Sequence, residues 1–349
     1  MISIDSRRWN ERSILRYVGH LDQLAGIRPV EAADGLGRGN RMFQVWTGSG
    51  LSFQVVAERA LDISVCQYKG LPLAWISPVG EAHPAFYEPE ESGWLRTYGG
   101  GLFVTCGLDS FGDPSTDAGE QFGAHGRAST LPARCVGYRT HWVDDAEGKA
   151  RYELEVAGEV RQARLFGENL RLQRRIVTWL GSRAIRIEDT VTNEGFKPQP
   201  HMILYHFNMG FPLVSEDSEL LIEATETVPR DEDSRPGLNE CLRFQPPTPD
   251  YREQVFRHAP VANSDGKVHV ELRNPALGLG VRWSYEKAAL PHLFEWKQMG
   301  EGEYVVGIEP GNSSAIEGRA TARQRGDLPH LEPGEVRRYA IDLEVVEYG

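Results

Sequence analysis

The sequence predicts an all-β protein, a large antiparallel β-sandwich (a β-supersandwich) that forms one domain over residues 1–349. Apolar and polar residues alternate between Arg151 and Thr192 in segments of roughly ten residues that are separated by turn signals, which is typical of a sandwich or barrel. Segments with a helical period are few, so we expect less than about a fifth helix. No linker or internal repeat divides the chain.

Composition and charge exclude several classes of partner. The chain is 40% apolar and 25% charged, as is ordinary for a globular protein, and its formal net charge is −12. Phosphate-rich partners would be repelled, so we expect no nucleic acid and no membrane surface. There is no apolar run of about 18 residues and no secretory signal at the N-terminus. We therefore expect a cytoplasmic protein, and a homodimer is compatible with the sequence.

The four cysteines are expected to be reduced thiols, since their spacing fits neither a metal site nor an exported disulfide framework. They are widely separated along the chain: Cys66, Cys106, Cys135 and Cys241. Motifs for phosphate loops, nucleophile elbows and zinc sites are absent. We expect no cofactor and no bound metal.

The first third of the chain combines short strands with long loops. A short helix is expected within Ser13–Ala25, before Gly26. Strands are expected at 42–46, 51–57, 60–67 and 99–106, the first two joined as a hairpin by Thr47-Gly48-Ser49-Gly50. The segments 72–98 and 109–128 are expected to be long loops. Loops of this length in a compact domain are usually functional.

The rest of the chain is read as a series of strands. The alternating region is divided at Ala157-Gly158, Gly167-Glu168-Asn169 and Gly181-Ser182, which predicts strands at 151–157, 159–165, 170–179 and 184–192. An acidic, proline-rich surface loop is expected at 228–248. Further strands are expected at 201–207, 220–224, 268–273, 279–285, 293–298, 305–309 and 339–346.

The stretch Tyr304–Arg319 places a carboxylate at an expected strand end. Tyr304, Val305, Val306 and Ile308 favour a strand, with Gly307 as its one weak point, and the turn signal Pro310-Gly311-Asn312 follows. Glu309 is then the last strand residue, at the rim of a sheet where side chains meet ligands. Taken alone, a solvated strand-end Glu is the commoner explanation.

Other residues supply the chemistry that a carboxylate would need in a sugar site. His206 lies in a strand among large apolar residues, and His125 lies between glycines that allow close backbone approach. A histidine titrates near neutral pH and can exchange a proton with a ring oxygen. Arg59 and Arg127 can bind hydroxyls or an anion through forked hydrogen bonds, and Trp296 can stack on a sugar ring. A core histidine or a histidine in a surface turn remains the simpler explanation for either residue alone.

In combination, several segments resemble the aldose 1-epimerase (galactose mutarotase-like) superfamily, and most closely its bacterial DUF4432 branch. The resemblance covers nearly the whole chain. It is carried by Glu58–Ile63, Tyr68-Lys69-Gly70 through Gly80, Phe122–Arg127, Asp189 through Asn208, Val228–Asp231 and Gly307–Pro310.

The resemblance implies a β-supersandwich that acts on a carbohydrate. Glu309 of the Glu-Pro motif would be the base and His206, directly before Phe-Asn, the acid. His125 and Asn208 would bind substrate, and Arg127, also expected to bind substrate, corresponds loosely to the arginine of hexose-6-phosphate epimerases. In mutarotases the motif is His-x-Tyr-Phe-Asn, so the histidine is shifted by two positions here and keeps the same strand face.

The leading functional hypothesis is cofactor-free interconversion of sugar anomers by acid–base catalysis. An aldose–ketose isomerase or a sugar-acid epimerase would use the same two residues to move a proton at carbon. A carbohydrate-binding protein without turnover would need a pocket but no acid opposite a base. The Asp-His-Asn motif by which mutarotases contact sugar hydroxyls has no counterpart here, so the sequence does not point to galactose.

Overall fold

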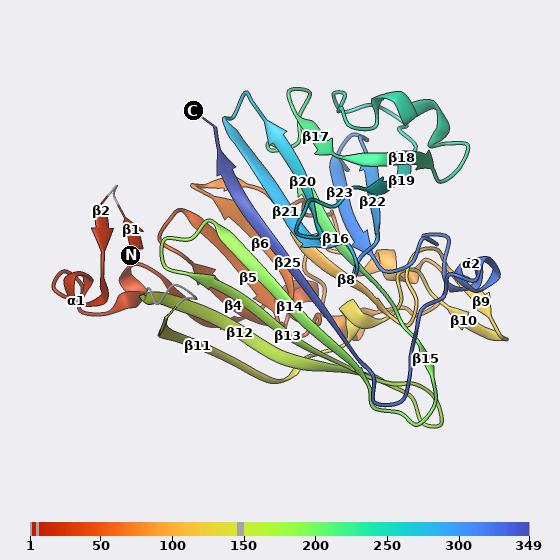
Figure 1. Ribbon diagram of the computed structural model, residues 1–349, viewed down its shortest axis with the longest axis horizontal. Helices are drawn as coiled ribbons and strands as arrows, with labels where there is room; N and C mark the ends of the chain where they lie inside the picture. Colours follow the sequence, from red (N-terminus) through yellow and green to blue (C-terminus); the bar gives the residue numbers. More distant parts are fainter. Residues whose placement is uncertain (1, 5–6, 145–149, 349) are drawn as a thin grey trace.

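The computed structural model describes residues 2–4, 7–144 and 150–348, and its two large antiparallel sheets pack face to face (Figure 1). About half of the chain is strand and about a tenth is helix, which confirms the predicted all-β fold class. One sheet has eleven strands and the other has eight. Among the described residues no helix is long and apolar enough to cross a membrane.

The eleven-stranded sheet contains the strands that later form the site. Its order is β18 (Ala224–Pro229), β19 (Gln254–Pro260), β22 (His292–Gln298), β23 (Val305–Gly311), β16 (Met202–Gly210), β8 (Phe103–Leu108), β6 (Asp62–Tyr68), β5 (Leu51–Val56), β4 (Arg41–Trp46) and β3 (Gly26–Glu31), with β7 (Leu71–Pro72) beside β6.

The eight-stranded sheet covers the other side of the core. Its order is β11 (Arg134–Asp144), β12 (Ala150–Ala163), β13 (Asn169–Trp179), β14 (Ala184–Asn193), β25 (Val336–Glu347), β21 (Leu279–Glu286), β20 (Lys267–Asn274) and β17 (Glu219–Ile222).

Short elements complete the described part of the chain. Three small strand pairs are β1 (Ile2–Ile4) with β2 (Arg7–Trp9), β9 (Ser115–Asp117) with β10 (Glu120–Phe122), and β15 (Gln199–Pro200) with β24 (His330–Leu331). The helices are α1 (Glu11–Ile14) and α2 (Arg319–Arg325), with 3₁₀ turns η1 (Leu21–Gln23), η2 (Gly35–Gly37), η3 (Pro84–Phe86), η4 (Gly93–Arg96), η5 (Ala128–Thr130) and η6 (Arg235–Glu240).

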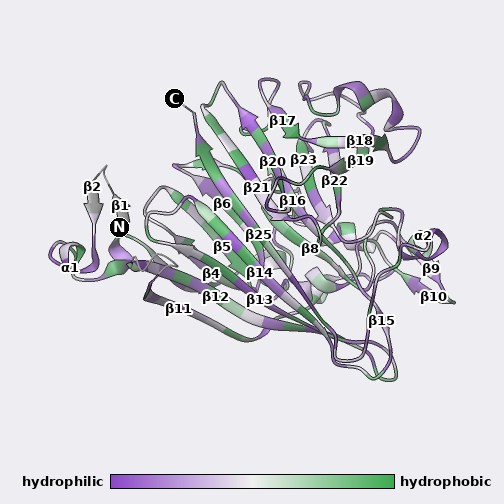
Figure 2. Ribbon diagram, in the orientation of Figure 1, coloured by the Kyte–Doolittle hydropathy of each residue, from purple (hydrophilic) through white to green (hydrophobic). Residues whose placement is uncertain are grey.

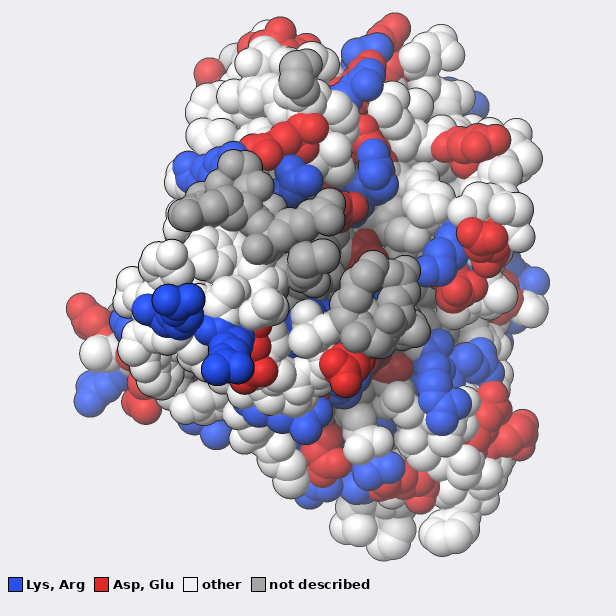
Figure 3. Space-filling model, turned by 60° about the vertical axis from the view of Figure 1, so that its left-hand side comes forward, with Lys and Arg blue, Asp and Glu red and all other residues white. Residues whose placement is uncertain are grey.

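The core lies between the two sheets and follows from strand alternation. In β14, Ile185, Ile187 and Val191 are buried, whereas Arg186 and Glu188 between them face outward. The strands in Figure 2 accordingly alternate between hydrophobic and hydrophilic residues. In the view of Figure 3, acidic and basic side chains are intermixed across the molecular surface.

The structure corrects two of the predicted boundaries. The expected helix within Ser13–Ala25 is only the short α1, capped by Asn10, followed by the separate turn η1. The expected turn at Ala157-Gly158 lies inside the continuous strand β12. Gly158 makes no turn but leaves room for its neighbours, since a Cβ atom at this position would lie 3.1 Å from Leu61 Cδ1 and 3.2 Å from Val136 Cγ2.

Candidate active site

His206 and Glu309 face each other on neighbouring strands of the eleven-stranded sheet. Strand β16 pairs with β23 through Leu204 opposite Gly311 and Phe207 opposite Ile308, and this register places His206 opposite Glu309. Directly opposite residues of an antiparallel pair share a face of the sheet. The distance from His206 Nε2 to Glu309 Oε1 is 3.2 Å.

The pair lies on the face of the sheet that is turned away from the sandwich core. Phe207 and Ile308, the next residues along each strand, point into the core instead. The expectation that the strand stops at Glu309 is wrong, because β23 continues to Gly311. Pro310 removes only one donor from the ladder, and Glu309 is a fully buried strand residue rather than a residue at an open rim.

Burial acts on the protonation of both groups. It raises the pKa of Glu309 well above its ordinary value and lowers the pKa of His206 well below its own. The two atoms in contact are not aligned for a hydrogen bond, and Glu309 Oε1 and His206 Nδ1 have no hydrogen-bond partner within the described residues. Since burial disfavours both charges, it favours the neutral pair, in which Glu309 is protonated and the imidazole of His206 is uncharged.

Aromatic rings wall the space in front of the pair. Tyr98 stacks on Trp94 at 4.2 Å between ring centroids, and Trp94 contacts His125 at 4.6 Å. The rings of His125 and Trp296 each lie 5.5 Å from that of His206. The arrangement places apolar ring faces beside the imidazole of His206 and the carboxyl group of Glu309.

His125 is held in place by the loop between β10 and η5. Its φ is 56°, an αL conformation that few side-chain-bearing residues adopt. Its N–H donates to the carbonyl of Gly112 at 2.8 Å, and a Cβ atom on Gly126 would lie only 2.3 Å from the carbonyl of Ser110. Burial lowers the pKa of His125 to about 4, so its ring is neutral at physiological pH.

A charged rim completes the site on the side of β18 and β19. Arg230 Nη2 donates to Glu253 at 3.1 Å, and the other oxygen of Glu253 accepts from Trp296 Nε1 at 2.8 Å. Burial raises the pKa of Asp113, which also faces the cavity. Glu253 thus fixes the indole of Trp296, and Asp113 adds an acceptor for hydroxyl groups.

Together these groups enclose a cavity of about 200 Å³. Its lining residues come from segments that span most of the chain: Ser92, Trp94, Leu95, Tyr98, Gly112, Asp113, Pro114, Ala124, His125, His206, Arg230, Glu253, Val255, Trp296, Glu309 and Ile316. Three of the lining residues have a buried polar atom without a partner among the described residues: His125 Nδ1, His206 Nδ1 and Glu309 Oε1. Such atoms are costly in a folded protein and indicate groups that a ligand satisfies.

Four of the seven residues proposed from the sequence line this cavity, namely Glu309, His206, His125 and Trp296. The other three do not. Asn208 is buried beside the site, where its side chain accepts from Tyr98 at 2.6 Å. Arg59 is buried behind Tyr98 and donates to the carbonyl of Ala82 at 3.1 Å, and Arg127 is exposed beyond the turn that carries His125.

Sequence reasoning missed Arg230, Glu253, Asp113, Trp94 and Tyr98. Arg230 lies in the Val228–Asp231 segment that carries the family resemblance, and Asp113, Trp94 and Tyr98 lie in the two long loops expected to be functional. The family resemblance and the length of the two loops indicated the segments that form the site, but not which of their side chains line the cavity. Glu253 lies in a segment with no motif, so nothing in the sequence marks it.

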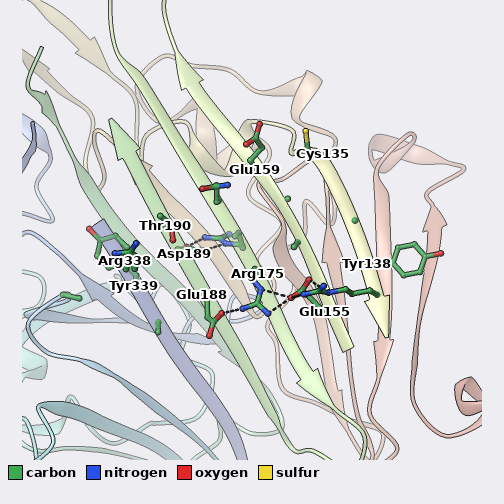
Figure 4. Close-up of a pocket in the computed structure, with 18 of the residues that line it drawn as sticks. Cys135, Tyr138, Glu155, Glu159, Arg175, Glu188, Asp189, Thr190, Arg338 and Tyr339 are labelled. Carbon is green, nitrogen blue, oxygen red and sulfur yellow. Dashed lines mark hydrogen bonds and ion pairs between the residues drawn. The ribbon is translucent and has the colours of Figure 1, made fainter. Parts of the chain in front are cut away.

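A larger hollow of about 960 Å³ lies on the outer face of the eight-stranded sheet (Figure 4). Its charges pair with one another. Arg175 lies between Glu155 and Glu188 and donates to Glu155 at 2.7 Å, and Arg139 Nε lies 2.9 Å from the same carboxylate. Burial raises the pKa of Glu155, but its hydrogen bonds to Arg139 and Arg175 outweigh that effect and lower the pKa, while the pKa of Arg175 is raised. Both groups are therefore held in their charged forms and neither exchanges a proton near neutral pH, so the smaller cavity is the better candidate.

Among the described residues no group of three or more His, Cys, Asp and Glu side chains is arranged to bind a metal.

Solved structures place this architecture among known folds. A "putative aldose 1-epimerase" from Klebsiella pneumoniae is 25% identical with a TM-score of 0.85, covering 94% of this chain and 86% of its own. A galactose mutarotase-like protein from Clostridium acetobutylicum is 12% identical with a TM-score of 0.63, covering 93% and 99%. A galactose 1-epimerase from Lactobacillus acidophilus is 12% identical with a TM-score of 0.57, covering 93% and 100%.

The fold is that of the galactose mutarotase-like proteins. Within that class, the chain belongs to the family described as domain of unknown function DUF4432, which it matches over residues 37–345. No curated protein matches the sequence at a significant level.

Proposed function

We propose that this protein is an aldose 1-epimerase-like isomerase that interconverts the anomers of a sugar or sugar derivative. The observation that carries the proposal is the pair of His206 and Glu309, 3.2 Å apart on one face of the sheet. Both groups have pKa values shifted by burial, and both face a cavity of about 200 Å³ with aromatic walls. Perturbed titratable groups that converge in a cleft are characteristic of acid–base sites.

The geometry suits the two oxygens of a hemiacetal carbon. The anomeric hydroxyl and the ring oxygen are bonded to the same carbon, so two groups in contact can reach both at once. Glu309 takes the proton of the hydroxyl, the bond between the anomeric carbon and the ring oxygen breaks, and His206 gives a proton to the ring oxygen. After rotation of the aldehyde group the two residues exchange roles and close the other anomer.

One proton on the pair is enough for both halves of this reaction. In ring opening it passes from His206 to the ring oxygen while Glu309 collects the hydroxyl proton, and in ring closure the movement is reversed. The pair ends each turnover with the same number of protons. Ring opening ends with Glu309 protonated and His206 neutral, which is the distribution that burial favours. Its starting state, with the proton on His206, is reached by proton transfer from Glu309 to His206 within the pair.

Exchange spectroscopy by NMR in D₂O with a panel of aldoses tests the reaction. We expect anomer exchange above the spontaneous rate, without deuterium entering a C–H bond. Deuterium at carbon would instead show an aldose–ketose isomerase or a sugar-acid epimerase on the same residues. Ligand shifts with neither exchange would show a binding protein.

Variants at the pair test the mechanism. Glu309→Gln and His206→Ala should each lower kcat at least about a hundredfold, and the double variant little further, because the residues act together. Glu295→Gln is the matched control. Glu295 of β22 is also buried, but it lies opposite Ile308 of β23 and therefore faces the other side of the sheet. Rates are divided by the folded fraction from circular dichroism. Wild-type rates per folded molecule in both single variants would refute the mechanism.

A further inference from the structure

Residues directly opposite one another on four neighbouring strands form a row that runs from Glu309 to an arginine. Val228 pairs with Arg257, Arg257 with Phe294, and Phe294 with Glu309. These side chains therefore share the face that carries His206. Neighbouring strands are about 4.8 Å apart, so the backbone of Arg257 lies roughly 10 Å from that of Glu309, with Phe294 between them.

A second cavity of about 240 Å³ opens at this end of the row. It adjoins the catalytic cavity, since Arg230, Val255 and Ile316 line both. Phe294, which is buried, contributes to its floor. The two cavities are therefore direct neighbours.

The charges that line the second cavity are mainly positive, although the chain as a whole is acidic. Arg230, Arg257 and Arg325 line it together with the single carboxylate of Glu317. Arg325 is already paired with Glu317 at 2.7 Å. Within the described residues, Arg257 has neither an ion pair nor a side-chain hydrogen bond, and Arg230 leaves Nη1 free after bonding Asp231 and Glu253.

A half-buried arginine without a counter-charge is unfavourable unless a ligand supplies the charge. The free guanidinium of Arg257 and the free Nη1 of Arg230 at one cavity provide N–H donors of the kind that bind oxyanions. We propose that this second cavity binds a compact oxyanion, a phosphate ester or a carboxylate, on the end of the sugar remote from its anomeric carbon. The proposal rests on the proposed function for its orientation, with the anomeric carbon at Glu309 and the oxyanion at Arg257.

Turnover of matched sugars tests this assignment. An aldohexose, its 6-phosphate and the corresponding hexuronate are compared by the same exchange measurement. At least one anionic sugar should exceed the neutral hexose in kcat/KM by about tenfold or more, mainly through a lower KM, as expected for hydrogen bonds to charged groups. The two anionic sugars distinguish a phosphate from a carboxylate.

Substitution of the arginine isolates its contribution. Arg257→Gln should remove most of the preference, lowering the anionic-to-neutral ratio of kcat/KM about tenfold. Arg252→Gln, a matched loss of charge at an exposed arginine that pairs with Asp233, should keep the wild-type ratio. Thermal melting of both variants separates a change of binding from a loss of fold.

A binding measurement separates this proposal from the proposed function. Calorimetry with inorganic phosphate and with the hexose 6-phosphate is carried out on wild type, Glu309→Gln and Arg257→Gln at low salt. Binding that depends on Arg257 without any anomer exchange would support the anion site and overturn the proposed function. Equal use of neutral and anionic sugars, together with anion binding unaffected by Arg257→Gln, would overturn the anion site alone.

Discussion

At the scale of single residues, the titratable groups of the candidate site lower the stability of the fold because they are buried. Glu309 is 2% exposed and His206 is 4% exposed, and each has a polar atom without a partner in the described residues. Removing such groups from water is unfavourable, and buried polar groups without a partner are kept where function requires them. The raised pKa of Glu309 and the lowered pKa of His206 are the measurable signs of this cost.

The first prediction follows from the raised pKa of Glu309. An unfolded glutamate releases its proton near pH 4.3, while the folded protein holds the proton to higher pH, so this residue lowers stability as pH rises through that window. Glu309→Gln should therefore match wild type near pH 4 and become progressively more stable toward neutral pH, by up to about 1.4 kcal/mol per pH unit. Urea unfolding at several pH values measures this. A difference that does not vary with pH would contradict the burial argument.

At the scale of elements, the three strands β8, β16 and β23 explain why the site is hard to see in the sequence. Every residue of β16 is buried, as is every residue of β8 and β23. One face packs against the sandwich core and the other is covered by the loops that carry Trp94 and His125. Strands that are buried on both faces lose the apolar–polar alternation that reveals which side faces a ligand.

Gly307 is the element-scale determinant of how Glu309 fits. It lies opposite Trp296 on β22 and Asn208 on β16. A Cβ atom at this position would be 2.4 Å from Glu309 Oε1 and 3.3 Å from His206 Cε1. The glycine that weakens the strand in the sequence therefore leaves the space that the carboxylate of Glu309 occupies.

The second prediction is that Gly307→Ala displaces the carboxylate. A shift of about 1 Å in a catalytic group can cost on the order of a hundredfold in rate, so we expect a loss of at least tenfold in kcat/KM. Overpacking should cost about 1–3 kcal/mol of stability. Gly311→Ala on the same strand is the control, because its nearest atoms would be 3.5 Å away. Similar rates per folded molecule in the two variants would show that the space at Gly307 is not needed.

At the scale of the whole molecule, a buried polar network joins the two sheets beneath the site. Arg174 of β13 donates to Asp189 of β14 at 2.6 and 2.9 Å, and to Asp62 and Thr105 of the opposite sheet at 3.0 and 2.7 Å. Tyr205 of β16 donates to the same Asp189 at 2.8 Å. The strand that carries His206 is thus anchored from its inner face.

The third prediction concerns this network. Arg174→Met would leave the carboxylates of Asp62 and Asp189 buried without their cation, which should cost about 3–5 kcal/mol in urea unfolding. The matched control is Arg175→Met, the next residue along β13, whose side chain is 44% exposed and pairs with Glu155 and Glu188 on the outer face. That change should cost less than about 1 kcal/mol. Equal losses in the two variants would contradict the network's role.

The sequence by itself determined the class of fold and the chemical types at the centre of the site. Strand alternation such as that of Ile185, Ile187 and Val191 follows from local periodicity, which a single sequence shows directly. The resemblance implies a base at Glu309 and an acid at His206, and the structure brings those two residues into contact. Local signals failed at Gly158 and Pro310, where a turn residue lies inside a strand, in the case of Gly158 because Leu61 and Val136 leave little room for a side chain.

Only the tertiary structure decided which residues share the cavity. Trp94, Asp113, His125, Arg230 and Glu253 are separated by long stretches of chain, and no local pattern relates them. Their meeting depends on non-local strand pairing and on loops that fold over one face of a sheet. The same pairing set Arg257 in the row of Glu309 and left Arg59, Arg127 and Asn208 outside the cavity. The sequence specifies the type of each side chain, but strand register and packing across the whole molecule determine which side chains become its neighbours.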